Sequence, residues 1–171
     1  MSAVTVTNWV VILGIVALVV VRRKPELLPW NTTLDRAIIG GVLFAAGILK
    51  ARNSAEARMA VQAYRILPAH IAAILGYTLP WVEMAVALLL ILGVGVKASA
   101  WISAILMGVF IVAISQAWAR GLSIDCGCFG GGGTVAAGHT KYVQEIARDL
   151  GIFVIAIHLS LHPQGKWSLD K

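Results

Sequence analysis

Long apolar runs without charge recur along the chain. The first, Val4–Val21, is followed at once by Arg22-Arg23-Lys24, and Ala98–Trp118 is a second run with no charged residue. A helix needs about 20 consecutive apolar residues to cross a bilayer. The pattern therefore predicts membrane-spanning helices.

Three more spans complete this prediction. Leu34–Lys50 is short, but the long side chains of Arg36 and Lys50 can reach the interfaces from its two ends. Ala69–Val96 is long and contains Pro80, which predicts a kink. The last span covers about residues 146–162. Small residues in the second span would let a neighbouring helix approach closely; they are Gly40, Gly41, Ala45, Ala46 and Gly47.

The connections between spans are more polar. Pro25–Thr33 is rich in turn-forming residues, and Ala51–Leu67 is amphipathic, which predicts a helix lying at the membrane interface. Ala119–Gln144 is a polar loop that holds both cysteines and four consecutive glycines. The basic triplet after the first span favours a cytoplasmic location for that end. Counting crossings then places the N-terminus and the cysteine loop outside, on the same side as the Ala51–Pro68 connection.

Composition supports an integral membrane protein with one domain. Of 171 residues, 59% are hydrophobic and 13% are charged, against about 25% charged in a typical soluble domain. The net charge of +6 does not indicate nucleic-acid binding, because the basic residues are scattered between apolar runs. Such charges match anionic lipid headgroups and set topology.

The strongest chemical signal is Asp125-Cys126-Gly127-Cys128-Phe129-Gly130. In an extended stretch, side chains two residues apart point to the same face, so the two sulfurs can meet. A disulfide closing so small a ring is strained and easily reduced, and Gly127 supplies the backbone freedom it needs. The pair is therefore predicted to be redox-active.

Two alternatives stay open for the cysteines: metal binding and no chemistry. A zinc site needs four ligands, and only Asp125 and His139 are near in sequence. Asp125 disfavours a neighbouring thiolate unless it faces away, whereas a reactive thiolate needs a positive neighbour. Four residues on the predicted outer side could supply that charge: Arg120, His139, Lys141 and Arg148.

Charged residues inside apolar spans are the second signal. A carboxylate such as Glu83 within a span is costly unless it is paired, which marks it as a functional candidate. We expect Lys50, Glu83, Arg148 and Asp149 to lie toward the outer ends of their helices, level with the cysteine loop, and Glu83 to pair with Arg148 or Lys50. An ion pair that only locks helices together is the alternative. His158 is expected to make a helix–helix hydrogen bond.

The order of these features resembles the DoxX/MauE group of redox-associated membrane proteins over about residues 34–162. The resemblance rests on Asp35-Arg36, Gly47 with Lys50, Leu67-Pro68, Leu79-Pro80 with Glu83, the hexapeptide at 125–130 and Arg148-Asp149. The hexapeptide is the most specific part and is similar to the MauE side of the group.

This resemblance implies an all-α integral membrane protein whose core is a four-helix transmembrane bundle. The N-terminal transmembrane helix and its connection (1–33) are then an addition to the four-helix domain (34–162), and a tail follows (163–171). The resemblance also implies that Cys126 and Cys128 are the thiol pair and that Lys50, Glu83 and Arg148 are the matching polar positions. It indicates a bacterial plasma membrane, and a link to methylamine utilisation.

The function expected from these residues is a membrane thiol–disulfide oxidoreductase, or an accessory to one, that supports disulfide formation in exported proteins. With no second cysteine pair, the chain must exchange electrons with a quinone or with a separate thioredoxin-like extracytoplasmic protein. The alternatives are a non-enzymatic assembly subunit of a larger membrane complex and a metal-binding membrane protein.

Overall fold

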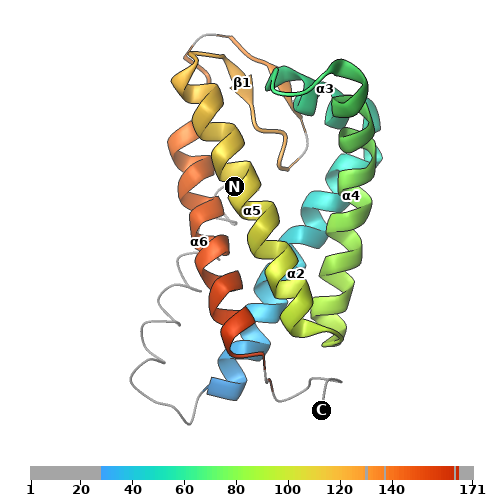
Figure 1. The fold of residues 1–171 in the computed structure, drawn as a ribbon, viewed down its shortest axis with the longest axis vertical. Helices are drawn as coiled ribbons and strands as arrows, with labels where there is room; N and C mark the ends of the chain where they lie inside the picture. The colour runs from blue at the N-terminus through green and yellow to red at the C-terminus, as the bar shows by residue number, and fades with distance from the viewer. Residues whose placement is uncertain (1–27, 130, 137, 164, 166–171) are drawn as a thin grey trace.

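Four long helices stand side by side in the computed structural model, which describes residues 28–129, 131–136, 138–163 and 165 (Figure 1). They are α2 (Leu28–Arg52), α4 (Ala69–Leu92), α5 (Val96–Ala119) and α6 (Tyr142–Leu161). The predicted first span, Val4–Val21, lies outside the described residues. Within them, α2 packs mainly on α4, and α5 packs mainly on α6.

Helix α2 begins earlier than the sequence indicated. The prediction of a turn-rich connection is wrong from Leu28 onward, because Pro29 and the residues after it are helical. Proline is tolerated in the first turn of a helix, where its missing N–H has no intrahelical acceptor. The helix is therefore 25 residues long. This is enough to cross a bilayer, whereas the predicted span Leu34–Lys50 was shorter than the about 20 residues that a crossing needs.

A glycine turn separates α4 from α5. Gly93 has φ 75° and donates its backbone N–H to the carbonyls of Leu89 and Leu90, and the N–H of Val94 returns to Leu89. This is the Schellman arrangement, in which a residue with positive φ ends a helix. The predicted continuous span Ala69–Val96 therefore ends at Leu92, and Val96 belongs to the next helix.

Two glycines set the close approach of α2 to α4. A Cβ atom on Gly40 would lie 2.7 Å from Ile91 Cγ1, and one on Gly47 would lie 2.9 Å from the Pro80 carbonyl oxygen. The predicted small-residue contact is confirmed at these positions. It is wrong for Gly41, which has nothing within 4 Å of such an atom, and for Ala45, which is exposed.

The bundle has an apolar core and an apolar exterior. Its core includes Ile39, Leu43, Leu90, Ile152, Ile155 and Leu159, each no more than 1% exposed. Large apolar side chains also cover the outside; Val112 is 68% exposed and Ile105 is 61% exposed. A soluble monomer rarely shows so much apolar surface, whereas lipid covers it without cost.

Three described helices are long and apolar enough to cross a membrane: Trp30–Arg52, Ala69–Leu92 and Val96–Ala119. Helix α6 has 20 residues and runs beside α5 through the height of the bundle (Figure 1). It carries Glu145, Arg148 and Asp149 in its first half, but all three side chains are buried inside the protein. The chain is an all-α integral membrane protein.

Helix α3 and the cysteine loop lie together at one end of the bundle (Figure 1). Helix α3 (Ser54–Ala63) links α2 to α4, as the amphipathic pattern predicted. The loop contains two short antiparallel strands that the sequence did not indicate, β1 (Ile124–Asp125) and β2 (Gly133–Thr134). Both strands contact α3. The prediction that the loop and the Ala51–Pro68 connection share one end is confirmed.

Candidate functional site

The cysteines lie in a tight turn that follows β1. Gly127 has φ 67°, a conformation that glycine adopts at little cost. Its N–H donates to Asp125 Oδ1 at 3.1 Å, and the N–H of Cys128 donates to Cys126 Sγ at 3.2 Å. The predicted extended conformation is wrong, because Gly127 has a positive φ. Both cysteines are free thiols in this structure.

Contacts from two helices, α3 and α6, fix this turn. The Tyr64 hydroxyl, at the end of α3, donates to the Cys126 carbonyl at 3.2 Å, and the Tyr142 hydroxyl of α6 donates to the Leu122 carbonyl. The backbone passes so close to α3 that a Cβ on Gly127 or Gly132 would lie 2.5 or 2.4 Å from the Cβ of Ala60. The glycines therefore allow the loop to pack against α3.

Arg148 supplies the positive charge beside Cys126. Its Nη2 atom lies 3.9 Å from Cys126 Sγ, and its guanidinium lies 4.7 Å from the centroid of the Phe129 ring. The guanidinium also pairs with Asp149 Oδ1 at 2.8 Å. Of the four basic residues that the sequence offered, the structure brings Arg148 to the sulfur. A cation next to a thiol favours the thiolate, which is the nucleophile in disulfide exchange.

The two sulfurs have different surroundings. Cys126 is half-buried, whereas Cys128 is 6% exposed. The hydrogen bond with Cys126 and burial raise the pKa of the Cys128 thiol well above its ordinary value, although Arg148 acts in the opposite direction. Cys126 is thus the accessible sulfur near a cation, and Cys128 is the protected sulfur that stays protonated at neutral pH.

Glu145 is a site residue that the sequence reasoning missed. Ligand atoms of Asp125, Cys126 and Glu145 all lie within 4.8 Å of one another. Glu145 is 8% exposed, and its Oε2 atom has no hydrogen-bond partner among the described residues. Its position one helical turn before Arg148 was the available signal, since residues three apart share a helix face. His139, the other predicted neighbour, is exposed and lies outside this cluster.

Lys50 and Glu83 form a buried ion pair below the cysteine turn. Lys50 Nζ lies 2.5 Å from Glu83 Oε1, and the two side chains are 6% and 1% exposed. Of the two partners predicted for Glu83, the structure selects Lys50. The expectation that Glu83 lies at the outer end of its helix is wrong, because it lies beyond the midpoint of α4.

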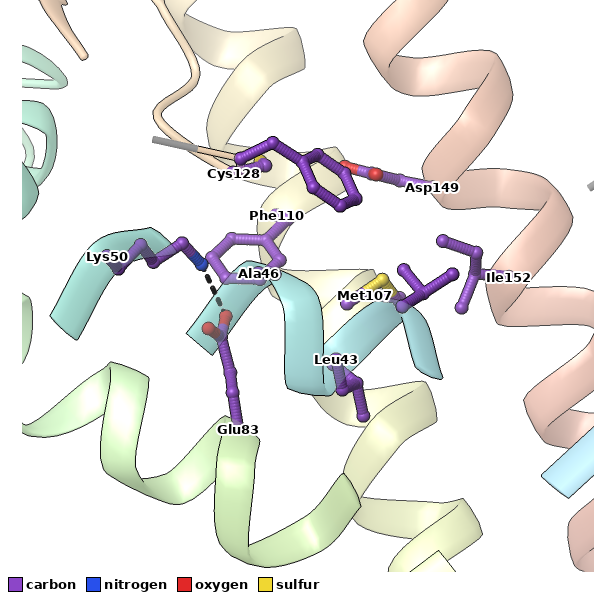
Figure 2. Close-up of a pocket in the computed structure, with 11 residues that line it drawn as sticks. Leu43, Ala46, Lys50, Glu83, Met107, Phe110, Cys128, Asp149 and Ile152 are labelled. Carbon is purple, nitrogen blue, oxygen red and sulfur yellow. Dashed lines mark hydrogen bonds and ion pairs between the residues drawn. The ribbon is translucent and has the colours of Figure 1, made fainter. Parts of the chain in front are cut away.

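A small cavity joins the ion pair to the buried thiol (Figure 2). Its volume is about 20 Å³, and Lys50, Glu83, Cys128 and Asp149 all line it. Figure 2 shows Cys128 and Asp149 on one side of the cavity, with Lys50 and Glu83 on another. Phe129 follows Cys128 into the same space. The turn therefore reaches between the helices to the level of Glu83.

The opposite end of the bundle has a separate polar contact. His158 Nδ1 lies 2.9 Å from Asp35 Oδ2, which joins α6 to α2 and confirms the predicted helix–helix hydrogen bond. Beside it, Arg36 donates to the carbonyls of Leu90 and Ile91 at the end of α4. The last carbonyls of a helix lack donors from a following turn; Arg36 supplies a donor to Ile91 and adds a second donor to Leu90, which also accepts from the Gly93 N–H. These groups stabilise the fold and lie far from the cysteines in sequence and in the bundle.

The family model described as "Methylamine utilisation protein MauE" matches residues 28–162. The chain belongs to the MauE family. Its match begins at Leu28, where α2 begins, and ends just after α6.

A curated MauE relative is also similar. The "Methylamine utilization protein MauE" of Methylorubrum extorquens is 37% identical over 105 residues, or 61% of this chain. The match covers 56% of the relative's length. No solved structure matches the chain. MauE membership confirms part of the resemblance seen in the sequence, and the wider relation to DoxX proteins stays a prediction.

Proposed function

We propose that this MauE protein is a membrane thiol–disulfide exchange protein in which Cys126 and Cys128 alternate between dithiol and disulfide. The observation that carries the proposal is the unequal pair: Cys126 is half-buried and 3.9 Å from Arg148 Nη2, and the backbone N–H of buried Cys128 lies 3.2 Å from the same sulfur. Such a pair has one sulfur suited to attack a partner and one suited to resolve the product.

The exchange needs a partner disulfide. The Cys126 thiolate attacks one partner sulfur, which forms a mixed disulfide and releases the other partner sulfur as a thiolate. The Cys128 thiolate then attacks Cys126 Sγ, which forms the Cys126–Cys128 disulfide and releases the second partner sulfur. The partner disulfide is reduced to two thiols, this pair is oxidised, and the two protons pass to the partner. The reverse sequence is equally allowed.

A thioredoxin-like extracytoplasmic protein is the partner that this chemistry favours. The cysteine turn lies beside α3, at the end of the bundle where α2 finishes. The basic block Arg22-Arg23-Lys24 precedes α2 and favours a cytoplasmic location for the start of that helix. The opposite end, which carries the cysteine turn, is then extracytoplasmic. Thiol pairs have a role in an oxidising compartment. Because the relative is named for methylamine utilisation, the proposed role is maturation of exported disulfide-containing proteins that this pathway uses.

A quinone is the other electron acceptor that the sequence left open. The cavity beside Glu83 holds about 20 Å³, whereas pockets for such ligands are about 300–1,000 Å³. A quinone ring would require the helices to separate. The thioredoxin-like partner is therefore the stronger candidate.

Single cysteine variants test the proposal with each other as controls. In cells that lack their own copy of the gene, the full chain carrying Cys128→Ser is expected to accumulate a reducible adduct with a partner, because the mixed disulfide on Cys126 cannot be resolved. Cys126→Ser is expected to give no adduct. The double variant should reach the membrane at normal levels but fail to support growth on methylamine. Normal growth and no adduct would refute disulfide exchange and favour the assembly-subunit alternative.

A metal site is the second candidate, because Asp125, Cys126 and Glu145 bring ligand atoms within 4.8 Å. The neighbouring Arg148 guanidinium opposes a divalent cation there, and three ligands fall short of the four usual for zinc. Metal analysis of purified protein decides this case. Stoichiometric zinc or copper that is lost in Cys126→Ser and in Glu145→Gln would establish the site, and its absence would leave disulfide exchange.

A further inference from the structure

Helix α2 leaves one long side exposed in the part of the chain that the structure describes. The exposed apolar positions recur every three or four residues, which places them on one face of the helix. Trp30 and Leu34, near the start of this face, are 49% and 46% exposed, and Leu49, near its end, is 37% exposed. The outer face of α2 consists of Trp30, Leu34, Ala37, Gly41, Ala45 and Leu49.

The middle of the outer face is built from small residues. Ala37, Gly41 and Ala45 are exposed, and a Cβ atom on Gly41 would meet no described residue within 4 Å. Small residues let the backbones of two membrane helices approach closely. On the other side of α2, Gly47 already allows such an approach to α4. The outer face therefore has the form of a second helix-packing surface.

The outer sides of the other long helices are different. They carry large apolar side chains, which suit contact with lipid. Examples from α4, α5 and α6 are Leu88, Ile105, Val112 and Val154, which are 47%, 61%, 68% and 48% exposed. Among the four long helices, α2 thus presents the exposed side best suited to another helix.

The apolar run Val4–Val21 has the right length to cover the outer face. The sequence predicts that this run crosses the membrane, and it lies outside the described residues. As a helix, its 18 residues would be about 27 Å long, and the outer face from Trp30 to Leu49 extends about 28 Å. Both lengths are close to the hydrocarbon thickness of about 30 Å. Neither the run nor the outer face contains a charged residue.

The connection between this run and α2 is short. Residues 22–27 are the six residues that separate Val21 from the start of α2 at Leu28. Fully extended, six residues span at most about 20 Å, and connections of this length join antiparallel neighbouring helices. A short tether also gives an effective concentration in the millimolar range. The chain's own segment is therefore favoured over a second copy as the occupant of the outer face.

We propose that the outer face of α2 is the docking surface for the predicted Val4–Val21 span, which packs antiparallel to α2 across Ala37, Gly41 and Ala45. The MauE family match begins at residue 28, so the surface receives a segment that lies outside the family match. The contact is van der Waals packing of apolar side chains against the exposed glycine and alanines. The outer sides of α4, α5 and α6 then remain in contact with lipid.

Disulfide crosslinking in membranes tests this docking. The full chain first receives Cys126→Ser and Cys128→Ser, so that no native thiol competes. Ala37→Cys is then combined with cysteine substitutions, one at a time, at positions 9–16, which cover two helical turns of the run. A disulfide forms when two Cα atoms come within about 4.4–6.8 Å. Positions that face α2 should therefore link, and the linked positions should lie three or four residues apart.

The sequence provides a direct readout of the link. Trypsin cuts after Arg22, Arg36 and Lys50, which releases residues 1–22 and 37–50 as separate peptides. We expect a disulfide-linked pair of these peptides from the monomer band of a gel. Val109→Cys is the matched control, because Val109 is 58% exposed on α5; it is expected to give no link to any of positions 9–16.

Substitutions at Gly41 test the small residues themselves. Gly41→Leu is expected to abolish the link from Ala37→Cys, because the leucine side chain would hold the two helices apart. Gly41→Ala keeps the surface small and is expected to preserve the link. Neither change should disturb the core, since no described residue lies within 4 Å of a Cβ at this position.

Three results would overturn the proposal. A link found only in the dimer band would show that a second copy occupies the outer face. No link at any of positions 9–16, or equal linking by Ala37→Cys and Val109→Cys, would show that lipid covers it. A photo-activated amino acid at position 37 or 109 of the chain with its native cysteines gives the same comparison. Capture of residues 1–22 from position 37 and not from position 109 is expected there, even if the serine variant does not fold.

Discussion

The buried Lys50–Glu83 pair makes a quantitative prediction about stability. Replacing either residue with methionine removes one charge and leaves the other in a site that is 6% or 1% exposed. Breaking a buried ion pair by removing one partner costs about 3–5 kcal/mol, because the remaining charge is uncompensated. Each single variant, Lys50→Met and Glu83→Met, is expected to lose that much.

The double variant is expected to behave differently. Replacing both charges with apolar side chains of similar size is often neutral or stabilising, so Lys50→Met/Glu83→Met should lie within about 2 kcal/mol of the wild type. Lys50 also lies 5.1 Å from the centroid of the Phe110 ring. That cation–π contact contributes about 0.5–2 kcal/mol, which is less than the cost of leaving one charge of the pair unpaired. The loss of stability in each single variant is therefore expected to come mainly from breaking the Lys50–Glu83 pair.

Thermal unfolding of the full chain in detergent measures these effects. For a chain of this length, 1 kcal/mol shifts the unfolding midpoint by about 2–4 °C, so each single variant should unfold roughly 6–20 °C below the wild type. The matched control is Lys97→Met, since Lys97 is exposed at the start of α5. Its stability should stay within about 0.5 kcal/mol of the wild type.

Additivity would refute this reasoning. If the double variant loses the sum of the two single losses, within about 0.5 kcal/mol, Lys50 and Glu83 do not stabilise each other. The charges would then act through separate partners, and the cavity wall would not contain an ion pair.

Three further predictions follow from the close contacts and from the thiol. Gly47→Ala places a Cβ 2.9 Å from a carbonyl of α4 and should cost about 1–3 kcal/mol in thermal unfolding, whereas Gly41→Ala, with nothing within 4 Å, should be neutral. Gly132→Ala should displace the cysteine turn and slow disulfide exchange more than Gly131→Ala, because both have positive φ but only Gly132 meets α3; equal effects would assign the loss to backbone strain. Because the pKa of Cys128 is raised, its thiol is protonated at neutral pH. With a chromogenic aromatic disulfide as the partner, the second thiolate, released when Cys128 attacks the mixed disulfide, should therefore appear about tenfold faster per pH unit through pH ~8.5, the ordinary cysteine value; a plateau below pH ~8 would contradict the raised pKa.

Much of the fold was predictable because its causes are local. Apolar runs such as Ala98–Trp118 define helices to within a few residues, since length and hydropathy decide whether a segment can cross a bilayer. The start of α2 was not predictable in this way. Pro29 is typical of a loop and also of a first helical turn, and packing decides between the two.

The site was predictable in its residues but not in its arrangement. Two cysteines one residue apart and a carboxylate in an apolar span are visible in any sequence. Glu83 pairs with Lys50 and not with Arg148 because α2 packs closely against α4. Gly47 allows this close approach, and the sequence does not specify which helices pack together. The hydrogen bond from Tyr64 to the Cys126 carbonyl has no sequence signal, because nothing in the residues around Tyr64 indicates which acceptor its hydroxyl will meet.

The state of the two thiols in living cells tests the central claim most directly. Cells expressing the full chain are quenched with acid and labelled with a mass-shifting maleimide, and a parallel sample is first treated with a membrane-impermeant alkylator. We expect a mixture of dithiol and disulfide that shifts toward one form when the partner is removed, with Cys126 accessible from outside. A pair that stays reduced under every condition, or that reacts only after the membrane is permeabilised, would contradict it.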